Sequence, residues 1–577
     1  MRFALEQIGV RNTFGIPGVH NTEIYDELNK SELIEPVLVT HEGGAAFMAD
    51  ATSRTSNSIG TLLVVPAAGI THAASGIAEA HLDGIPMLVL SGGIRTDGMN
   101  YQLHDMDQHA LLAPITKATF KIKSQQEVIN TIYKAYDIAT SGEPGPVFVE
   151  VPIDIALFKG ECDKNITYAD YKKEQKKQDS SFENDEQVKL IGRAADLLLS
   201  STQAGFFVGW GCKEASAELV ELSELLAAPV STTLQGLSVF PANHPLHVGM
   251  GFGDYAVPAA DEAFKQIDCL LAIGTRFSEI PTGSFGMKVP DELIHIDINE
   301  EVFSANYPAS LAIKGDAKLV LRVLIKEIKG RLKSAINSDD MIALIARKKS
   351  DYQREWFSHD KPDKVNPARY FSALREFMAD DDFLVVDDGN HTFLTAELMP
   401  VHKSKRFISP TDFNCMGYCV PAAIATKLAN PNKKVVGIAG DGAFLMTCME
   451  LLTASSNKLG LIMTVFNDGE LAQISQAQAI PYNRKTCTQL EPYKVEGVAM
   501  ATGCEYIRVN NNTEISAALS RANSISAQGK PVILDINVDY SKPTRFTTGI
   551  VKTNLQRFKL SEKVRFISRA LKRRVTG

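Results

Sequence analysis

The sequence Val435-Val436-Gly437-Ile438-Ala439-Gly440-Asp441-Gly442 is an apolar strand pattern that runs directly into an acidic turn between two glycines. A helical pattern follows, then a second apolar strand, Leu461 to Phe466, and a second acidic turn, Asn467-Asp468-Gly469-Glu470. Mg²⁺ prefers oxygen ligands and usually combines one or two carboxylates with phosphate oxygens. Glycines allow the backbone to approach a diphosphate closely. The two turns therefore predict a site for a metal-bound diphosphate, although Gly-Asp-Gly alone is also typical of a surface turn.

Apolar strands alternate with amphipathic helices along the whole chain, which is typical of α/β proteins with parallel sheets. With 577 residues and 45% hydrophobic content, the chain is long enough for about three domains. Charged stretches of low hydrophobicity at about residues 163–186 and 333–366 are expected to be linkers between them. The predicted buried strands are residues 61–65, 87–91, 147–151, 205–208, 269–273, 293–298, 384–386 and 435–438.

Three N-terminal segments, Phe14 to Gly18, Thr40 to Asp50 and Asp83 to Met87, occur in the same order as in one enzyme family. Together with the segment from Gly440 to Gln478, they resemble the thiamine-diphosphate (ThDP) enzymes of the acetolactate synthase branch. The resemblance implies three doubly wound parallel-sheet domains, the first and third sharing a fold. We expect a pyrimidine-binding domain at 1–162, a central domain at 187–330, a diphosphate- and Mg²⁺-binding domain at 367–545 and a basic tail at 546–577.

The resemblance also gives roles to individual residues. Glu42 corresponds to the glutamate that hydrogen-bonds the aminopyrimidine ring and promotes cofactor activation; otherwise it is a glutamate favoured at a helix start. Asp441 corresponds to the first metal ligand and Asp468 to the second, which is more usually asparagine in the family. Asn467 is the alternative if the turn is slipped by one residue, and a backbone carbonyl near Glu470 would complete the protein ligands.

Further cofactor contacts are expected from the start of the third domain. Residues like Gly389, Asn390 and His391 contact the diphosphate in the family, together with Gly440 and Gly442. Met416 corresponds to a residue packed beneath the cofactor, a role that suits an unbranched, polarizable side chain. The alternatives are an ordinary core methionine for Met416 and a structural histidine for His391.

The central segment also resembles acetolactate synthase, in which this domain holds FAD. FAD is therefore an additional candidate cofactor, and Arg276 could pair with it or serve at a domain contact. The run Gly249-Met250-Gly251-Phe252-Gly253 departs from the family at a flavin-contacting segment, which leaves FAD binding open.

The acceptor pocket departs from the family as well. Gln473 and Ala477 stand where relatives that make acetohydroxy acids carry methionine and tryptophan, so the pocket is larger and more polar. His104 stands where glutamine is usual and is a candidate proton shuttle or a structural residue. His20 and His72 also replace smaller or amide residues near the motif loops.

The resemblance implies ThDP- and Mg²⁺-dependent decarboxylation of a 2-oxo acid, with pyruvate as the expected donor, and ligation of the remaining fragment to a second carbonyl compound. The alternatives are a decarboxylase without ligation and an inactive cofactor-binding or regulatory protein on the same fold. A homodimer or homotetramer is expected, because the family completes its site between subunits, and a regulatory subunit is a candidate partner.

Composition excludes several other classes. The net charge of −8 gives no electrostatic basis for nucleic-acid binding, and eight scattered cysteines without a Cys-x-x-Cys pair indicate neither a disulfide framework nor a zinc site. The N-terminus reads as an amphipathic helix rather than a signal peptide, and no apolar run predicts a membrane span. We expect a soluble, cytoplasmic protein. Its basic tail has Leu560, Val564, Ile567 and Leu571 on one helical face and is expected to dock on the body or lid the cofactor. Binding to a membrane surface or nucleic acid and a plain solvated helix are the alternatives.

Overall fold

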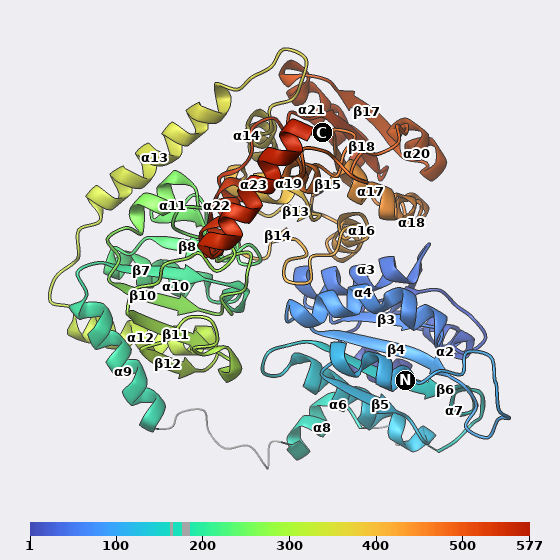
Figure 1. Cartoon of the computed structure of the whole chain (residues 1–577). Coiled ribbons are helices and arrows are strands. Elements are labelled where there is room, and N and C mark those ends of the chain that lie inside the picture. The colour runs from blue at the N-terminus through green and yellow to red at the C-terminus, as the bar shows by residue number, and fades with distance from the viewer. Residues whose placement is uncertain (162–165, 176–184, 577) are drawn as a thin grey trace.

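Three six-stranded parallel sheets with helices on their faces form the body of the protein in the computed structural model (Figure 1). The structure describes residues 1–161, 166–175 and 185–576. The domain limit at Cys162 and residues 163–165 and 176–184 of the predicted linker lie outside these residues. The described part of that linker differs from expectation, since it contains the helix Tyr168–Gln175 and the start of the helix Asp185–Ser200.

The first sheet has the strand order β2-β1-β3-β4-β6-β5. Its strands are β1 (Asn12–Gly15), β2 (Glu35–Leu38), β3 (Gly60–Val64), β4 (Met87–Gly93), β5 (Ala118–Lys121) and β6 (Pro146–Pro152). The helices that accompany it are α1 (Arg2–Gln7), α2 (Thr22–Leu28), α3 (Glu42–Thr55), α4 (Ala68–Leu82), α5 (Gln108–Leu112), α6 (Val128–Thr140) and α7 (Ile153–Leu157).

The second sheet has the order β12-β11-β10-β7-β8-β9. Its strands are β7 (Ala204–Val208), β8 (Val230–Thr232), β9 (His247–Met250), β10 (Cys269–Ile273), β11 (Glu292–Asp297) and β12 (Leu311–Lys314). Helix α8 (Tyr168–Gln175) precedes this part of the chain, and α9 (Asp185–Ser200), α10 (Ser216–Leu226), α11 (Pro258–Ala263) and α12 (Ala317–Arg331) belong to it.

The third sheet, β14-β13-β15-β16-β18-β17, repeats the order of the first, so the prediction that these two domains share a fold is confirmed. Its strands are β13 (Phe383–Val386), β14 (Phe407–Ile408), β15 (Val435–Gly440), β16 (Ile462–Asn467), β17 (Glu505–Val509) and β18 (Val532–Asn537). The helices are α14 (Pro367–Phe377), α15 (Asn390–Leu398), α16 (Cys419–Ala429), α17 (Asp441–Thr447), α18 (Leu451–Ser456), α19 (Ala472–Tyr482), α20 (Val495–Thr502) and α21 (Ile515–Ser526).

The strands predicted from apolar runs are found within one or two residues of the expected limits. They are buried along nearly their whole length, as β4 and β15 illustrate, because helices cover both faces of a parallel sheet. The predicted linker at 333–366 differs from expectation, since it contains the helix α13 (Asp339–Phe357). Helix α13 buries Ile345, Tyr352 and Trp356, which are widely spaced in the sequence. The charged residues between them dominate the sequence pattern, and for this reason the segment was predicted to be a linker.

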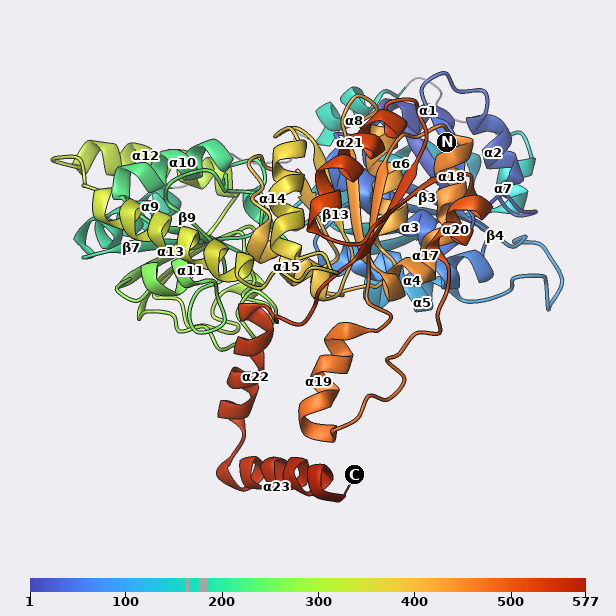
Figure 2. The ribbon, with the colours of Figure 1, turned by 90° about the horizontal axis from the view of Figure 1, so that it is seen from above.

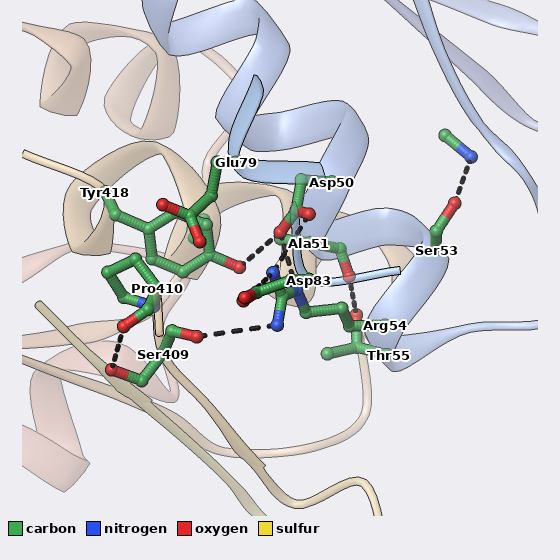
Figure 3. A network of polar contacts seen from close by, with 12 residues as sticks. Asp50, Ala51, Ser53, Arg54, Thr55, Glu79, Asp83, Ser409, Pro410 and Tyr418 are labelled. Carbon is green, nitrogen blue, oxygen red and sulfur yellow. Dashed lines mark hydrogen bonds and ion pairs between the residues drawn. The ribbon is translucent and has the colours of Figure 1, made fainter. Parts of the chain in front are cut away.

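The first and third sheets meet where α3 packs against α16, and a buried polar network lies at this contact (Figures 1 and 3). The guanidinium of Arg54, 1% exposed, pairs with Asp50 at 2.7 Å and with Asp83 at 2.8 Å. From the third domain, the Tyr418 hydroxyl donates to Asp50 at 2.6 Å and the Ser409 carbonyl accepts from Arg54. The charged groups of the first domain are thus bound at the interface by neutral polar groups of the third.

An arm of helices extends from the body (Figure 2). It consists of α19, α22 (Arg545–Arg557) and α23 (Leu560–Thr576), and α23 packs on α19. The tail docks partly as predicted, because Arg557 of α22 donates to the Ser284 carbonyl at 2.6 Å. The apolar face predicted on α23 is exposed: Leu560, Val564, Ile567 and Leu571 have exposed fractions of 79, 59, 53 and 57%. No helix in the described part of the chain has the length and apolar character that a membrane crossing requires.

Candidate functional site

The two acidic turns predicted to bind metal lie side by side, because β15 and β16 are paired neighbours in the third sheet. Asp441, 2% exposed, begins α17. Its carboxylate accepts N–H bonds from Gly442 at 2.8 Å, from Gly469 at 2.6 Å and from Asp468 at 3.2 Å. The second turn is therefore folded around the first carboxylate.

The side chains of the second turn differ in what they can offer a cation. Burial and the Asp441 carboxylate raise the pKa of Asp468 to about 7, which indicates two carboxylates that repel one another. The amide of Asn467 instead donates to Asp535 at 3.1 Å, and the carboxylate of Glu470 pairs with a lysine. A divalent cation would relieve the repulsion between the two aspartates. The amide oxygen of Asn467 is not used in its bond to Asp535, so Asn467 and Asp468 both stay candidates for the second ligand, whereas the Glu470 carboxylate is already paired.

A cradle for a diphosphate lies between β13 and β15, where the order of the third sheet reverses direction. Ligands of doubly wound sheets bind at this crevice beyond the carboxyl ends of the strands. Gly389 precedes α15 with φ +146°, and a Cβ there would lie 2.7 Å from the ring of His391. A Cβ on Gly440 would lie 3.2 Å from the same ring. The buried Asn390 begins the helix between them, so the three predicted residues at 389–391 and Gly440 are brought together.

His391 has an unused hydrogen-bonding atom in this cradle. Its Nε2 is buried without a partner, and burial lowers the pKa of the ring to about 3, so the imidazole is neutral. Buried polar atoms without partners are rare and often mark ligand sites. Asp388 Oδ1 and Asn414 Oδ1 are also buried and have no hydrogen-bond partner among the described residues. The polar atoms and the glycine backbone together fit a phosphate-bearing ligand.

Two residues of this region were not predicted from the sequence. The buried carboxylate of Asp387 accepts N–H bonds from Gly417 and Cys419, both at 2.8 Å, and so fixes the loop that carries the half-buried Met416. Burial raises the pKa of Asp387 to about 7. An aspartate directly after the strand at 383–386 was the feature that could have revealed this role.

The second missed residue is Tyr540, which follows β18. Its hydroxyl is buried without a partner, and burial with the charges of Asp468 and Asp441 raises its pKa. Tyr540 is therefore a candidate residue near the two acidic turns. A lone tyrosine after a strand carries no motif, so no sequence pattern pointed to it.

Glu42 begins α3 in the first domain and is 8% exposed. Its carboxylate contacts Nδ1 of His72 at 2.9 Å, and the His72 ring stacks on His41 at 4.7 Å. No hydrogen bond or ion pair among the described residues joins Glu42 to the cradle. The third domain contacts the chain just before α3, where Glu450 accepts from the Thr40 hydroxyl at 2.6 Å. Glu42 with its surroundings and the cradle are called the two candidate half-sites below.

The remaining candidates lie in a loop of the first domain and on the arm. His104 has φ +66°, and its ring meets that of His20 edge-on at 5.2 Å. Burial and His104 lower the pKa of His20, whose Nδ1 has no partner. Gln473 is half-buried and Ala477 exposed on α19 of the arm. The acceptor-pocket substitutions therefore sit on an element that projects from the body.

The cleft predicted for FAD lies at the reversal point of the central sheet, beyond β7 and β10. Its volume of 90 Å³ is well below the roughly 300–1,000 Å³ of small-molecule pockets. The guanidinium of Arg276 is engaged by Asp412 at 2.6 Å and Glu143 at 3.3 Å. The ring of Tyr255 packs against Gly251 in the run that departs from the family. The cleft does not fit FAD in this arrangement, and FAD remains a prediction.

Three stretches of the chain match models of thiamine pyrophosphate enzymes: the N-terminal TPP binding domain at 3–111, the central domain at 191–324 and the C-terminal TPP binding domain at 387–536. The acetolactate synthase large subunit of Buchnera aphidicola subsp. Schizaphis graminum is 30% identical, with 92% of this chain and 93% of the relative covered. The probable acetolactate synthase large subunit of Methanocaldococcus jannaschii is 32% identical, with 93% and 90% covered. Acetolactate synthase isozyme 1 large subunit of Escherichia coli (strain K12) is 28% identical, with 93% and 92% covered.

Proposed function

Because the chain belongs to the thiamine pyrophosphate enzymes, we propose that it is a ThDP- and Mg²⁺-dependent carboligase that decarboxylates a 2-oxo acid, with pyruvate as donor. The observation that carries the proposal is the pair of acidic turns at Asp441 and Asp468 beside the unpaired imidazole of His391. The likeness to acetolactate synthase large subunits over nearly the full chain supports the choice of reaction.

In this proposal each residue has a task set by its surroundings. Asp441, Asp468 and the backbone near Glu470 hold Mg²⁺, and His391 with the backbone at Gly389 and Gly440 holds the diphosphate. When bound, ThDP supplies a nucleophilic carbon that stabilises the negative charge left by decarboxylation. Glu42 shares a proton with the aminopyrimidine ring. The 8% exposure of Glu42 restricts competing proton exchange with water.

A decarboxylase without ligation is the second candidate. Gln473 and Ala477 replace the large apolar residues expected in the acceptor pocket, and the His20–His104 pair places two imidazoles near the first half-site. An imidazole can protonate a product before a second carbonyl compound adds. Incubation of the purified protein with pyruvate, ThDP and Mg²⁺, with acetolactate and acetaldehyde resolved, separates the candidates. Acetolactate supports the carboligase, acetaldehyde with CO₂ supports the decarboxylase, and no turnover contradicts pyruvate as donor.

We propose a homodimer, alone or paired in a tetramer, in which Glu42 of one subunit faces the cradle of another. Both half-sites carry exposed apolar side chains that a second copy would cover. Near His104, Met99 and Tyr101 are 87 and 97% exposed, and beyond Asp441, Met446 is 62% exposed. A regulatory subunit is a further proposed partner, since the relatives are named large subunits.

Mixing two inactive variants should restore activity if sites form between subunits. In a dimer of one Glu42→Gln and one Asp441→Asn chain, one site carries both substitutions and the other carries neither. Dimers purified through two different tags are all mixed and carry one intact site of two, so they should recover about half of wild-type activity. Activity of co-expressed chains, purified through two different tags, is the measurement. A mixture as inactive as each parent would contradict a shared site.

Replacing Asp441 with asparagine should weaken Mg²⁺-dependent ThDP binding by about tenfold to a hundredfold. The substitution removes a charge and also turns an N–H group toward the donors of Gly442 or Gly469. Calorimetric titration of ThDP with and without Mg²⁺ measures the effect. Asp340→Asn, at an exposed position of α13, is the matched control and should bind as wild type. An unchanged Mg²⁺ dependence in Asp441→Asn would contradict the metal assignment.

A further inference from the structure

A cavity of 520 Å³ lies between the central domain, helix α13 and helices α14 and α15. None of the residues lining it belongs to the cradle or to the surroundings of Glu42. One part of its wall is apolar and includes Val248, Ala259 and Leu398. Its volume is within the range of pockets that bind small organic molecules.

A second part of the wall is cationic. The ammonium group of Lys349 has one polar neighbour, Nδ1 of His247 at 3.5 Å, and no carboxylate forms a salt bridge with it in the described part of the chain. Burial lowers the pKa of Lys349 to about 8. His247 is 6% exposed and its Nε2 has no partner; burial and then Lys349 lower its pKa well below the usual value. Lys349 is half-buried, and a cation held there without a counter-ion would be stabilised by a bound anion.

The other charged groups do not neutralise this end of the cavity. Lys348 reaches Glu262 of α11 at 3.5 Å. Arg375 donates to backbone carbonyl oxygens, one of them that of Pro400 at 3.2 Å. The carboxylate of Glu397 accepts from the Tyr352 hydroxyl, and burial raises its pKa to about 7, which reduces its negative charge at neutral pH. Glu376 also lines the cavity and is exposed. Three further titratable groups lie beside the cations but do not line the cavity: Asp380, His244 and His402.

We propose that this cavity binds a small organic anion, whose carboxylate pairs with Lys349 and whose apolar body packs against Val248, Ala259 and Leu398. A lining that is both charged and apolar favours a ligand with both properties. The site is independent of the proposed reaction, because it shares no residue with the half-sites.

The cavity lies against a helix that also reaches the cradle, so a ligand bound in the cavity can affect ThDP binding. Helix α15 lines it through Glu397 and Leu398 at its carboxyl end. The same nine-residue helix begins with Asn390 and His391 in the cradle. A ligand that fixes one end of a short rigid helix also restricts its other end, so occupancy of the cavity should alter ThDP affinity.

Calorimetric titration of the full chain with octanoate tests the site, with acetate as the anion that lacks an apolar body. Octanoate should bind the wild type, and acetate should bind at least about tenfold more weakly because it buries little apolar surface. Lys349→Met should weaken octanoate binding by about tenfold or more, the usual effect of losing a charged hydrogen bond. Lys349→Arg retains the charge and should bind as wild type.

The pH dependence gives an independent readout. Wild-type affinity for octanoate should fall as pH rises from about 7 to about 9, since Lys349 loses its proton in this range. Lys349→Arg stays protonated and should keep its affinity. Ala242→Phe fills the cavity without changing its charge and should also abolish binding. Equal octanoate binding by wild type, Lys349→Met and Ala242→Phe, or no binding by a folded wild type at millimolar octanoate, would overturn the proposal.

Discussion

Replacing Glu42 with glutamine should lower kcat by about 10²- to 10⁴-fold, the usual contribution of a positioned acid–base group. Glutamine keeps the size of the side chain and a hydrogen-bonding oxygen but cannot share a proton with the cofactor. The substitution should therefore lower the turnover number, and the dissociation constant for ThDP should stay within a few-fold of the wild-type value. Steady-state product formation and calorimetric titration of ThDP on the same preparation measure the two quantities.

The controls for Glu42→Gln separate chemistry from folding. Glu32→Gln changes an exposed glutamate of the same domain and should be as active as wild type. His72→Asn removes the imidazole that contacts Glu42 at 2.9 Å and tests whether this contact orients the carboxylate. If Glu42→Gln retained wild-type kcat, the proposed role of Glu42 would be wrong, whatever the fate of the metal site.

Replacing Arg54 with leucine should destabilise the contact between the first and third domains by about 3–5 kcal/mol, the usual cost of breaking a buried ion pair. The substitution leaves Asp50 and Asp83 buried without their cation. Urea unfolding followed by tyrosine fluorescence and circular dichroism measures the shift. Because a chain of several domains need not unfold in one step, the comparison rests on the transition that both probes share.

Two variants test whether charge causes this loss. Arg369→Leu removes an arginine that is 39% exposed and paired with Asp360 at 2.8 Å, and it should cost less than about 1 kcal/mol. Adding Asp83→Asn to Arg54→Leu removes one uncompensated carboxylate and should recover part of the stability. If the double variant were no more stable than Arg54→Leu, lost packing rather than unpaired charge would explain the effect.

The sequence predicted the fold well because its strands are buried on both faces. Continuous apolar runs such as residues 87–91 and 435–438 leave little choice of structure, and glycine-flanked turns mark their ends. Helix α13 was missed because most of its surface is exposed and charged. The same reasoning could not locate the cavity beside it, whose walls come from segments far apart in the chain.

The proximity of the two acidic turns was predictable because the turns end adjacent strands. A choice between Asn467 and Asp468 was not, since both side chains offer an oxygen atom at this turn. Asp387 and Tyr540 act through burial and through neighbours distant in sequence, which no local pattern encodes. Whether Glu42 and the cradle form one site depends on a second chain.

The buried network around Arg54 also constrains the order of events during synthesis. Its partners Ser409 and Tyr418 follow Arg54 and Asp50 by 355 and 368 residues. At about 5–20 residues per second, the ribosome needs roughly 20–70 s to produce them. During that interval Arg54 has only Asp50 and Asp83 of its own domain as partners. The network is therefore completed only after the chain has been synthesised beyond Tyr418.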